Sequence, residues 1–312
     1  MSKDAVLLIA HGSPERFEDI PEFLQNISRG RPMAEAVVRE VQHRYSLIGS
    51  SPLTRITRQQ ADGVSRELGI LAYVGMRNWH PFIADTLQQM TADGVERAVA
   101  ICLAPHNSRT SVGLYKQVLF GNRAPFAIDF VEEWHDHPLL IEAFAERLRA
   151  GWTKACAEQG SQIPVLFTAH SVPQRTIAEG DPYEAQTRET AALVAARVAE
   201  IGAWCFAFQS QGMSGGEWLG PTVEDTITSL RDAGQTAVFV QPIGFVCDHV
   251  EILFDVDILF RDFSRERGIK LYRAESLNDS PLFIRAVADL ARARLSAFTP
   301  DCKAAVPAEK IS

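Results

Sequence analysis

One short stretch occurs twice in this chain, as Leu7-Leu8-Ile9-Ala10-His11-Gly12-Ser13-Pro14-Glu15-Arg16 and, 166 − 7 = 159 residues later, as Leu166-Phe167-Thr168-Ala169-His170-Ser171-Val172-Pro173-Gln174-Arg175. Each copy ends an aliphatic run with a histidine, which predicts a buried strand followed by a polar side chain. Ligand crevices of parallel sheets lie outside the carboxyl ends of the strands. We therefore expect His11 and His170 to face one cleft, although a histidine in this place can also merely satisfy backbone groups.

Similar aliphatic runs alternate with longer helical patterns along the whole chain, which is typical of parallel strands joined by crossover helices. Strands are predicted near residues 6–10, 71–76, 98–103, 127–131, 164–168, 204–208, 237–241 and 270–272. Helices are predicted over 34–47, 82–90, 139–157, 189–201, 223–231, 249–260 and 281–295. The sequence thus predicts an α/β fold with two domains, 1–138 and 139–298, each with four strands, and a flexible tail over 299–312.

Composition narrows the class of protein. The 312 residues are 46% hydrophobic and 22% charged, and the net charge of 31 − 39 = −8 argues against nucleic acid as a partner. Five cysteines, each more than forty residues from the next, form neither a zinc motif nor a disulfide framework. The longest apolar run is far below the ~20 residues that span a bilayer, and no signal-peptide pattern precedes the first strand. We expect a cytoplasmic protein without an integral membrane segment.

Three acidic residues mark the second half. Asp248, Glu251 and Asp255 are spaced i, i+3, i+7, so they lie on one face of the predicted helix, with His249 beside them. Acids in a first turn commonly serve the helix dipole, but that explanation does not account for Asp255. If His170 faces this row, the site combines a base with carboxylates and suits the transfer of a divalent metal or of protons.

Two further segments suit ligand binding. Residues 208–221 follow a predicted strand and include Trp218. Their glycines match neither the GxGxxG nor the GxxxxGK(S/T) spacing of phosphate-binding loops. A flat apolar ligand therefore suits this segment at least as well as a phosphate does. Arg29, Arg31 and Arg44 form a local excess of arginine in an acidic chain. Such arginines are usually a solvated face, and the alternative is a docking site for ligand carboxylates.

Together these segments resemble the ferrochelatases, which insert ferrous iron into porphyrins in haem synthesis. The matching pieces are Ala169-His170-Ser171-Val172-Pro173, Gln209-Ser210 through Trp218-Leu219-Gly220-Pro221, Pro242-Ile243-Gly244-Phe245 through Asp248-His249-Val250-Glu251, Leu103-Ala104-Pro105-His106, and Gly49-Ser50-Ser51-Pro52-Leu53. The resemblance implies two Rossmann-like domains of the class II chelatase fold with a porphyrin in the interdomain cleft. It also implies that His170 and Glu251 are the catalytic and metal-binding pair.

The resemblance further implies the remaining site residues. Asp255 is a candidate metal ligand, and His11 is a candidate axial ligand to the iron. The residues expected to bind the porphyrin are His11, Ser13, Arg29, Arg31, Arg44, Ser51, Tyr115 and Trp218. Fe²⁺ is a substrate, and no tightly bound cofactor is expected.

Within the family, the chain resembles the coproporphyrin branch. The segment 27–53 carries arginines instead of the long apolar lip of the protoporphyrin branch, and coproporphyrin III has four propionates against two. Iron coproporphyrin would then pass to a decarboxylase that completes haem. The alternatives are a protoporphyrin IX ferrochelatase, a cobalt or nickel chelatase of other tetrapyrroles, and a non-catalytic porphyrin or haem carrier.

Two positions depart from the family pattern. His11 stands where coproporphyrin ferrochelatases commonly have a tyrosine, and its imidazole either ligates iron or hydrogen-bonds within the turn. Leu259 stands where relatives often have another acid, so the row of carboxylates is shortened. Cys302 alone cannot hold an iron–sulfur cluster of the kind that some relatives carry.

Overall fold

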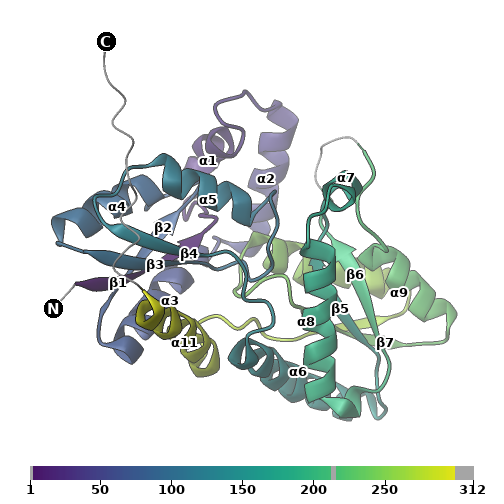
Figure 1. Ribbon diagram of the computed structural model, residues 1–312. Helices are drawn as coiled ribbons and strands as arrows, with labels where there is room; N and C mark the ends of the chain where they lie inside the picture. Colours follow the sequence, from purple (N-terminus) through teal and green to yellow (C-terminus); the bar gives the residue numbers. More distant parts are fainter. Residues whose placement is uncertain (1–2, 212–215, 299–312) are drawn as a thin grey trace.

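Two parallel sheets form the frame of the protein. The computed structural model describes residues 3–211 and 216–298, and in that part of the chain eight strands form two sheets with the orders β2-β1-β3-β4 and β6-β5-β7-β8 (Figure 1). The strands are β1 (Asp4–Ala10), β2 (Leu71–Met76), β3 (Arg97–Cys102), β4 (Ala127–Val131), β5 (Val165–His170), β6 (Trp204–Gln209), β7 (Ala237–Pro242) and β8 (Lys270–Arg273). The predicted α/β class with four parallel strands in each half is confirmed. The tail predicted over 299–312 lies outside the described residues.

The first strand of each half is a central strand of its sheet. β1 pairs with β2 on one side and β3 on the other, and β5 pairs in the same way with β6 and β7. Because successive connections leave this strand in opposite directions, a crevice opens at its carboxyl end. His11 directly follows β1 and His170 is the last residue of β5, so each histidine stands at the crevice of its half.

Helices cover both faces of the sheets (Figure 1). In the first half they are α1 (Ile20–Ile27), α2 (Glu35–Ile48), α3 (Leu53–Leu68), α4 (Ile83–Ala92) and α5 (Val112–Gly121), with a 3₁₀ turn η1 (Phe17–Asp19). In the second half they are α6 (Pro138–Gln159), α7 (Gln174–Ala178), α8 (Tyr183–Arg197), α9 (Val223–Asp232), the π-helix η3 (Glu251–Phe260), α10 (Arg261–Glu266) and α11 (Pro281–Ala297), with a 3₁₀ turn η2 (Ala199–Ile201). The helix predicted over 189–201 in fact begins six residues earlier and ends at Arg197, before η2. No described helix is long and apolar enough to cross a membrane.

One hydrophobic core joins the two halves. Phe283 and Val287 of α11 belong to the same buried cluster as Val6 of β1 and Phe167 of β5. At Gly63 of α3 an added Cβ would lie 2.9 Å from the side chain of Ile284, so the glycine permits the close approach of α3 and α11. The predicted limits 1–138 and 139–298 remain a prediction, and α11 packs against elements on both sides of that boundary.

Candidate active site

A cavity of about 590 Å³ lies between the two halves, within the usual size of a small-molecule site. Eight of the predicted site residues line it: His11, Ser13, Arg44, Tyr115, His170, Trp218, Glu251 and Asp255. The expectation that both strand-ending histidines face one cleft is therefore confirmed. Arg29, Arg31 and Ser51 do not line this cavity.

His170 presents one free ring nitrogen to the cavity. Its Nδ1 lies 2.5 Å from the backbone oxygen of Ser171, and because a carbonyl only accepts, Nδ1 carries the proton. The hydroxyl of Tyr183 donates to the backbone oxygen of His170 at 3.0 Å and fixes this end of β5. The lone pair of Nε2 is left to accept a proton or to bind a metal.

Glu251 supplies the carboxylate that faces this nitrogen. Its Oε2 lies 3.7 Å from Nε2 of His170 and 3.9 Å from Nε2 of His249, and this oxygen is buried without a hydrogen-bond partner. Burial raises the pKa of Glu251, but the neighbouring His170, His249, His11 and Arg44 lower it by more, so the net pKa lies below its usual value. A buried and unpaired carboxylate oxygen is costly, and a proton or cation would relieve that cost.

Asp255 is the second acid of the cavity. Burial raises its pKa to about 6, although a hydrogen bond from the hydroxyl of Ser210 opposes the shift. Nη1 of Arg44 approaches its Oδ1 at 3.7 Å. Asp255 therefore titrates near neutral pH and can exchange protons with neighbouring groups.

The prediction that Asp248, Glu251 and Asp255 form one row of acids is wrong for Asp248. Its carboxylate accepts hydrogen bonds from Ser276 at 2.7 Å and Asn278 at 2.9 Å, and it does not line the cavity. The prediction assumed one helix through all three acids, whereas Asp248 lies before the first helical residue, Val250, and residues 251–260 form a π-helix. Only Glu251 and Asp255, four residues apart, reach the cavity.

His249 is a third imidazole at this site, and the sequence analysis gave it no role. It lines the cavity, its Nδ1 donates to the backbone oxygen of Cys247 at 3.1 Å, and its ring lies 4.5 Å from that of Phe245. Burial lowers its pKa. Its position between Asp248 and Glu251, in the segment Asp248-His249-Val250-Glu251, could have indicated that His249 belongs to the site. In the described ranges no three His, Cys, Asp or Glu side chains converge closely enough to hold a metal ion.

His11 lines the cavity with both ring nitrogens engaged. Nδ1 donates to the backbone oxygen of Gly12 at 2.9 Å, and Nε2 accepts from the side-chain amide of Asn78 at 2.9 Å. Burial, followed by the charge of Arg77, lowers its pKa to about 4. Two roles were expected for His11, iron ligation and hydrogen bonding within the turn, and the structure shows the hydrogen bonding.

The other predicted porphyrin contacts fall into two groups. Ser13 shares a 2.6 Å hydrogen bond with Tyr45, and the guanidinium of Arg44 lies 5.0 Å over the ring of Phe254. Outside the cavity, Arg29 and Arg31 are exposed in the turn after α1. Ser51 is buried, and its hydroxyl has no hydrogen-bond partner.

Arg77 is a site residue that the sequence analysis missed. It lines the cavity, its guanidinium lies 5.1 Å over the ring of Tyr115, and its Nε is buried without a partner. The available signal was its position directly after β2, because β2 neighbours β1 and ends at the same edge of the sheet. Together with Arg44 it brings a second cation to the cavity wall.

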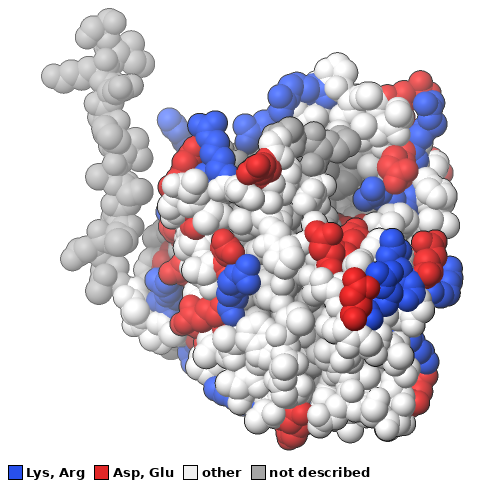
Figure 2. All heavy atoms as spheres, turned by 90° about the vertical axis from the view of Figure 1, so that its right-hand side faces the viewer, with Lys and Arg blue, Asp and Glu red and all other residues white. Residues whose placement is uncertain are grey.

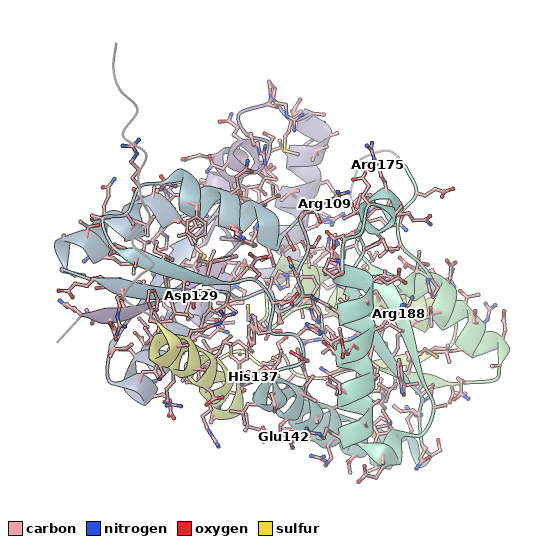
Figure 3. All side chains as sticks on the ribbon, viewed as in Figure 1. Arg109, Asp129, His137, Glu142, Arg175 and Arg188 are labelled. Carbon is pink, nitrogen blue, oxygen red and sulfur yellow. The ribbon has the colours of Figure 1, made fainter. Side chains whose placement is uncertain are left out.

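Ionic contacts join the halves beside the cavity. Arg109 of the first half and Arg175 of the second, both labelled in Figure 3, bind different oxygens of Glu179. The backbone nitrogen of Arg109 also donates to Asp181 at 2.8 Å. On the described part of the face in Figure 2, acidic and basic side chains alternate in small groups. This face therefore has no extended basic surface of the kind that binds nucleic acid.

The fold is similar to that of two solved structures over most of the chain. SirB from Bacillus subtilis with Fe³⁺ superposes with a TM-score of 0.57 at 11% identity, covering 93% of this chain and 94% of that chain. CbiX, the terminal enzyme for biosynthesis of siroheme in denitrifying bacteria, gives 0.52 at 14% identity, covering 95% of this chain and 100% of that chain. At such low identity the likeness concerns the fold alone. The fold is that of the class II chelatases.

The sequence comparison is more specific. Residues 3–295 match the ferrochelatase family model. The chain is 53% identical over 306 residues to a ferrochelatase of Acidobacterium capsulatum, covering 93% of this chain and 94% of that protein. It is 33% identical over 305 residues to a coproporphyrin III ferrochelatase of Geobacillus sp., covering 94% and 98%. The chain belongs to the ferrochelatase family, the enzymes that insert iron into porphyrins.

Proposed function

We propose that this chain inserts ferrous iron into coproporphyrin III and releases iron coproporphyrin. The observation that carries the proposal is the unpaired Oε2 of Glu251, 3.7 Å from Nε2 of His170, in a cavity between the two halves. This pair offers a neutral base and an anion at one place. Metallation needs both, because Fe²⁺ replaces two pyrrole N–H protons.

His170 is the proposed base of the reaction. Its Nε2 lone pair accepts a proton from a pyrrole nitrogen, and the carboxylate of Glu251 stabilises the imidazolium that forms. The proton then passes to the acids, of which Asp255 titrates near pH 6. Two protons leave for each Fe²⁺ that enters, so His170 returns to its neutral form between the two transfers.

Glu251 is also the proposed first contact of the iron. An imidazole and carboxylates bind ferrous iron, although this set of ligands does not exclude cobalt, nickel or zinc. Asp255 extends the acidic wall on the same helix, four residues further on. Axial ligation by His11 would compete with the hydrogen bond that its Nε2 accepts from Asn78.

The wall of the cavity is proposed to bend the macrocycle. Metallation is easier when the nitrogen lone pairs point out of the ring plane, and contacts at the periphery can hold that shape. Tyr115 and Trp218 offer aromatic contacts and Ser13 offers a hydroxyl, whereas Ser51 lies outside the cavity. No tightly bound cofactor is needed for this exchange.

The preference for coproporphyrin III rests on charge. Arg44 and Arg77 line the cavity, and Arg29 and Arg31 are exposed on the same half. Guanidinium groups bind carboxylates bidentately, so four propionates use these cations better than two. A relative from Geobacillus sp. is named for this substrate, whereas the Acidobacterium capsulatum relative is named only ferrochelatase.

The place of the reaction in haem synthesis follows from its product. Iron coproporphyrin keeps propionates that haem lacks, so a decarboxylase must act after this enzyme. We assign the reaction to the lyases and the protein to the cytoplasm, with porphyrin and Fe²⁺ as its small-molecule partners.

An anaerobic metallation assay tests the proposal. The protein is mixed with Fe²⁺ or Co²⁺ and with coproporphyrin III or protoporphyrin IX, and the porphyrin spectrum is followed. We expect the highest kcat/KM with Fe²⁺ and coproporphyrin III. A clear preference for protoporphyrin IX or Co²⁺, or a binding shift without metallation, would contradict the proposed function.

A further inference from the structure

The two histidines of the repeated stretch differ in their free lone pairs. His170 and His11 each donate Nδ1–H to a neighbouring backbone oxygen, at 2.5 and 2.9 Å. Nε2 of His170 lies 3.7 Å from a carboxylate oxygen of Glu251. Nε2 of His11 instead accepts a hydrogen bond of 2.9 Å from the side-chain amide of Asn78. The Nε2 lone pair is thus free in His170, whereas in His11, the corresponding histidine of the other half, it accepts a hydrogen bond.

This hydrogen bond fixes one form of the His11 ring. The carbonyl of Gly12 requires a proton on Nδ1, and the amide nitrogen of Asn78 requires a lone pair on Nε2. A doubly protonated ring would set two N–H groups against each other. Burial and the charge of Arg77 act in the same direction.

Asn78 is itself held firmly. It is buried, its backbone nitrogen donates to the backbone oxygen of His11 at 2.9 Å, and its backbone oxygen accepts from Asn26 at 3.2 Å. The next residue, Trp79, is so close to Gly12 that an added Cβ there would lie 2.8 Å from its backbone nitrogen. The amide of Asn78 therefore has little freedom to move away from Nε2.

We propose that Asn78 is a positioning residue that occupies Nε2 of His11 and so keeps this imidazole from ligating the iron porphyrin. The inference rests on the proposed function, because an iron porphyrin must be the molecule that occupies the cavity. Protein side chains then contact the iron only from the side of His170 and Glu251. A second strong axial bond, which would hold the metallated product in the cleft, does not form.

The test uses preformed ferric coproporphyrin III and needs no turnover. It is added to the full chain, and the Soret band and the electron paramagnetic resonance spectrum are recorded. We expect the wild type and His11→Ala to give the same high-spin spectrum. Asn78→Leu, which keeps the size but removes the donor, should shift the Soret band and convert iron to the low-spin form. Adding His11→Ala to Asn78→Leu should restore the wild-type spectrum.

Asn78→Asp is the matched control. Its carboxylate only accepts, so it favours a proton on Nε2 of His11, and the iron should stay high-spin. A wild-type spectrum that changes with His11→Ala would overturn the inference, and this comparison does not depend on whether an Asn78 variant folds. A folded Asn78→Leu protein with the wild-type spectrum would overturn it as well. If the wild type does not bind the iron porphyrin at all, the proposed function fails together with the inference.

Discussion

Oε2 of Glu251 lies 3.7 Å from Nε2 of His170 and has no hydrogen-bond partner. The two residues come from different elements, the π-helix η3 and the end of strand β5. Nδ1 of His170 donates to the backbone oxygen of Ser171, so the lone pair of its Nε2 is left to accept a proton. In the proposed function, this pair takes up the two pyrrole protons one after the other.

Removing the charge of Asp255 should change the pH dependence of stability. Burial raises its pKa to about 6 from a usual 3.8, so between these values the folded state binds more protons than the unfolded state. Its contribution to stability then falls as pH rises through this window. Ionisation above pH 6 costs roughly 3 kcal/mol, since one pKa unit is about 1.4 kcal/mol. Asp255→Asn should be more stable than wild type at pH 8, with a gap that narrows towards pH 4.

Urea unfolding at several pH values measures this gap. Asp257→Asn is a matched control on the same helix, because Asp257 is paired with Arg273 at 2.8 Å and does not line the cavity. A constant difference between wild type and Asp255→Asn from pH 4 to 8 would rule out the raised pKa.

Arg44→Met should weaken the binding of coproporphyrin III more than the binding of protoporphyrin IX. Methionine keeps much of the apolar contact with Phe254 but removes the guanidinium, and a hydrogen bond to a charged group is worth about 1.5–3 kcal/mol. We expect a roughly tenfold or greater loss of affinity for coproporphyrin III in fluorescence quenching. Arg39→Met is the control, because Arg39 lies on the same helix, pairs with Glu35 and does not line the cavity. Equal losses for both porphyrins would argue against a charge-based preference.

Phe283→Ala should destabilise both halves together. This side chain is fully buried on α11 and packs near Trp134, in the core that contains strands of both sheets. Truncating a buried phenylalanine costs about 3–5 kcal/mol. Thermal unfolding should keep one transition at a lower temperature. Two separated transitions would show that the halves are independent.

Much of the fold could be predicted from the sequence, because strands depend on local patterns. All eight strands lie where the aliphatic runs predict them. Helix α3 was missed because its buried face includes polar residues such as Thr57 and Gln60, so few apolar residues mark that face. The π-helix was also missed, since the order of residues in 249–260 is compatible with an α-helix.

The site residues in the repeated stretch could be predicted from the sequence. Those that depend on contacts between distant parts of the chain could not. The repeated histidine predicted that His11 and His170 face one cleft, and the family resemblance added Glu251 to that site. Asn78 is 67 residues from His11 in the chain and meets it only through the pairing of β1 with β2. No single-sequence pattern contains that register.

The most direct measurement is the rate of anaerobic iron insertion in His170→Ala and Glu251→Gln. General base catalysis contributes about 10²–10⁴-fold, so we expect each variant to lose at least ~100-fold in the metallation rate while porphyrin binding is retained. His137→Ala is the control, because His137 pairs with Asp289 and does not line the cavity. Wild-type rates in either variant, with the protein folded, would contradict the central claim that this pair removes the pyrrole protons.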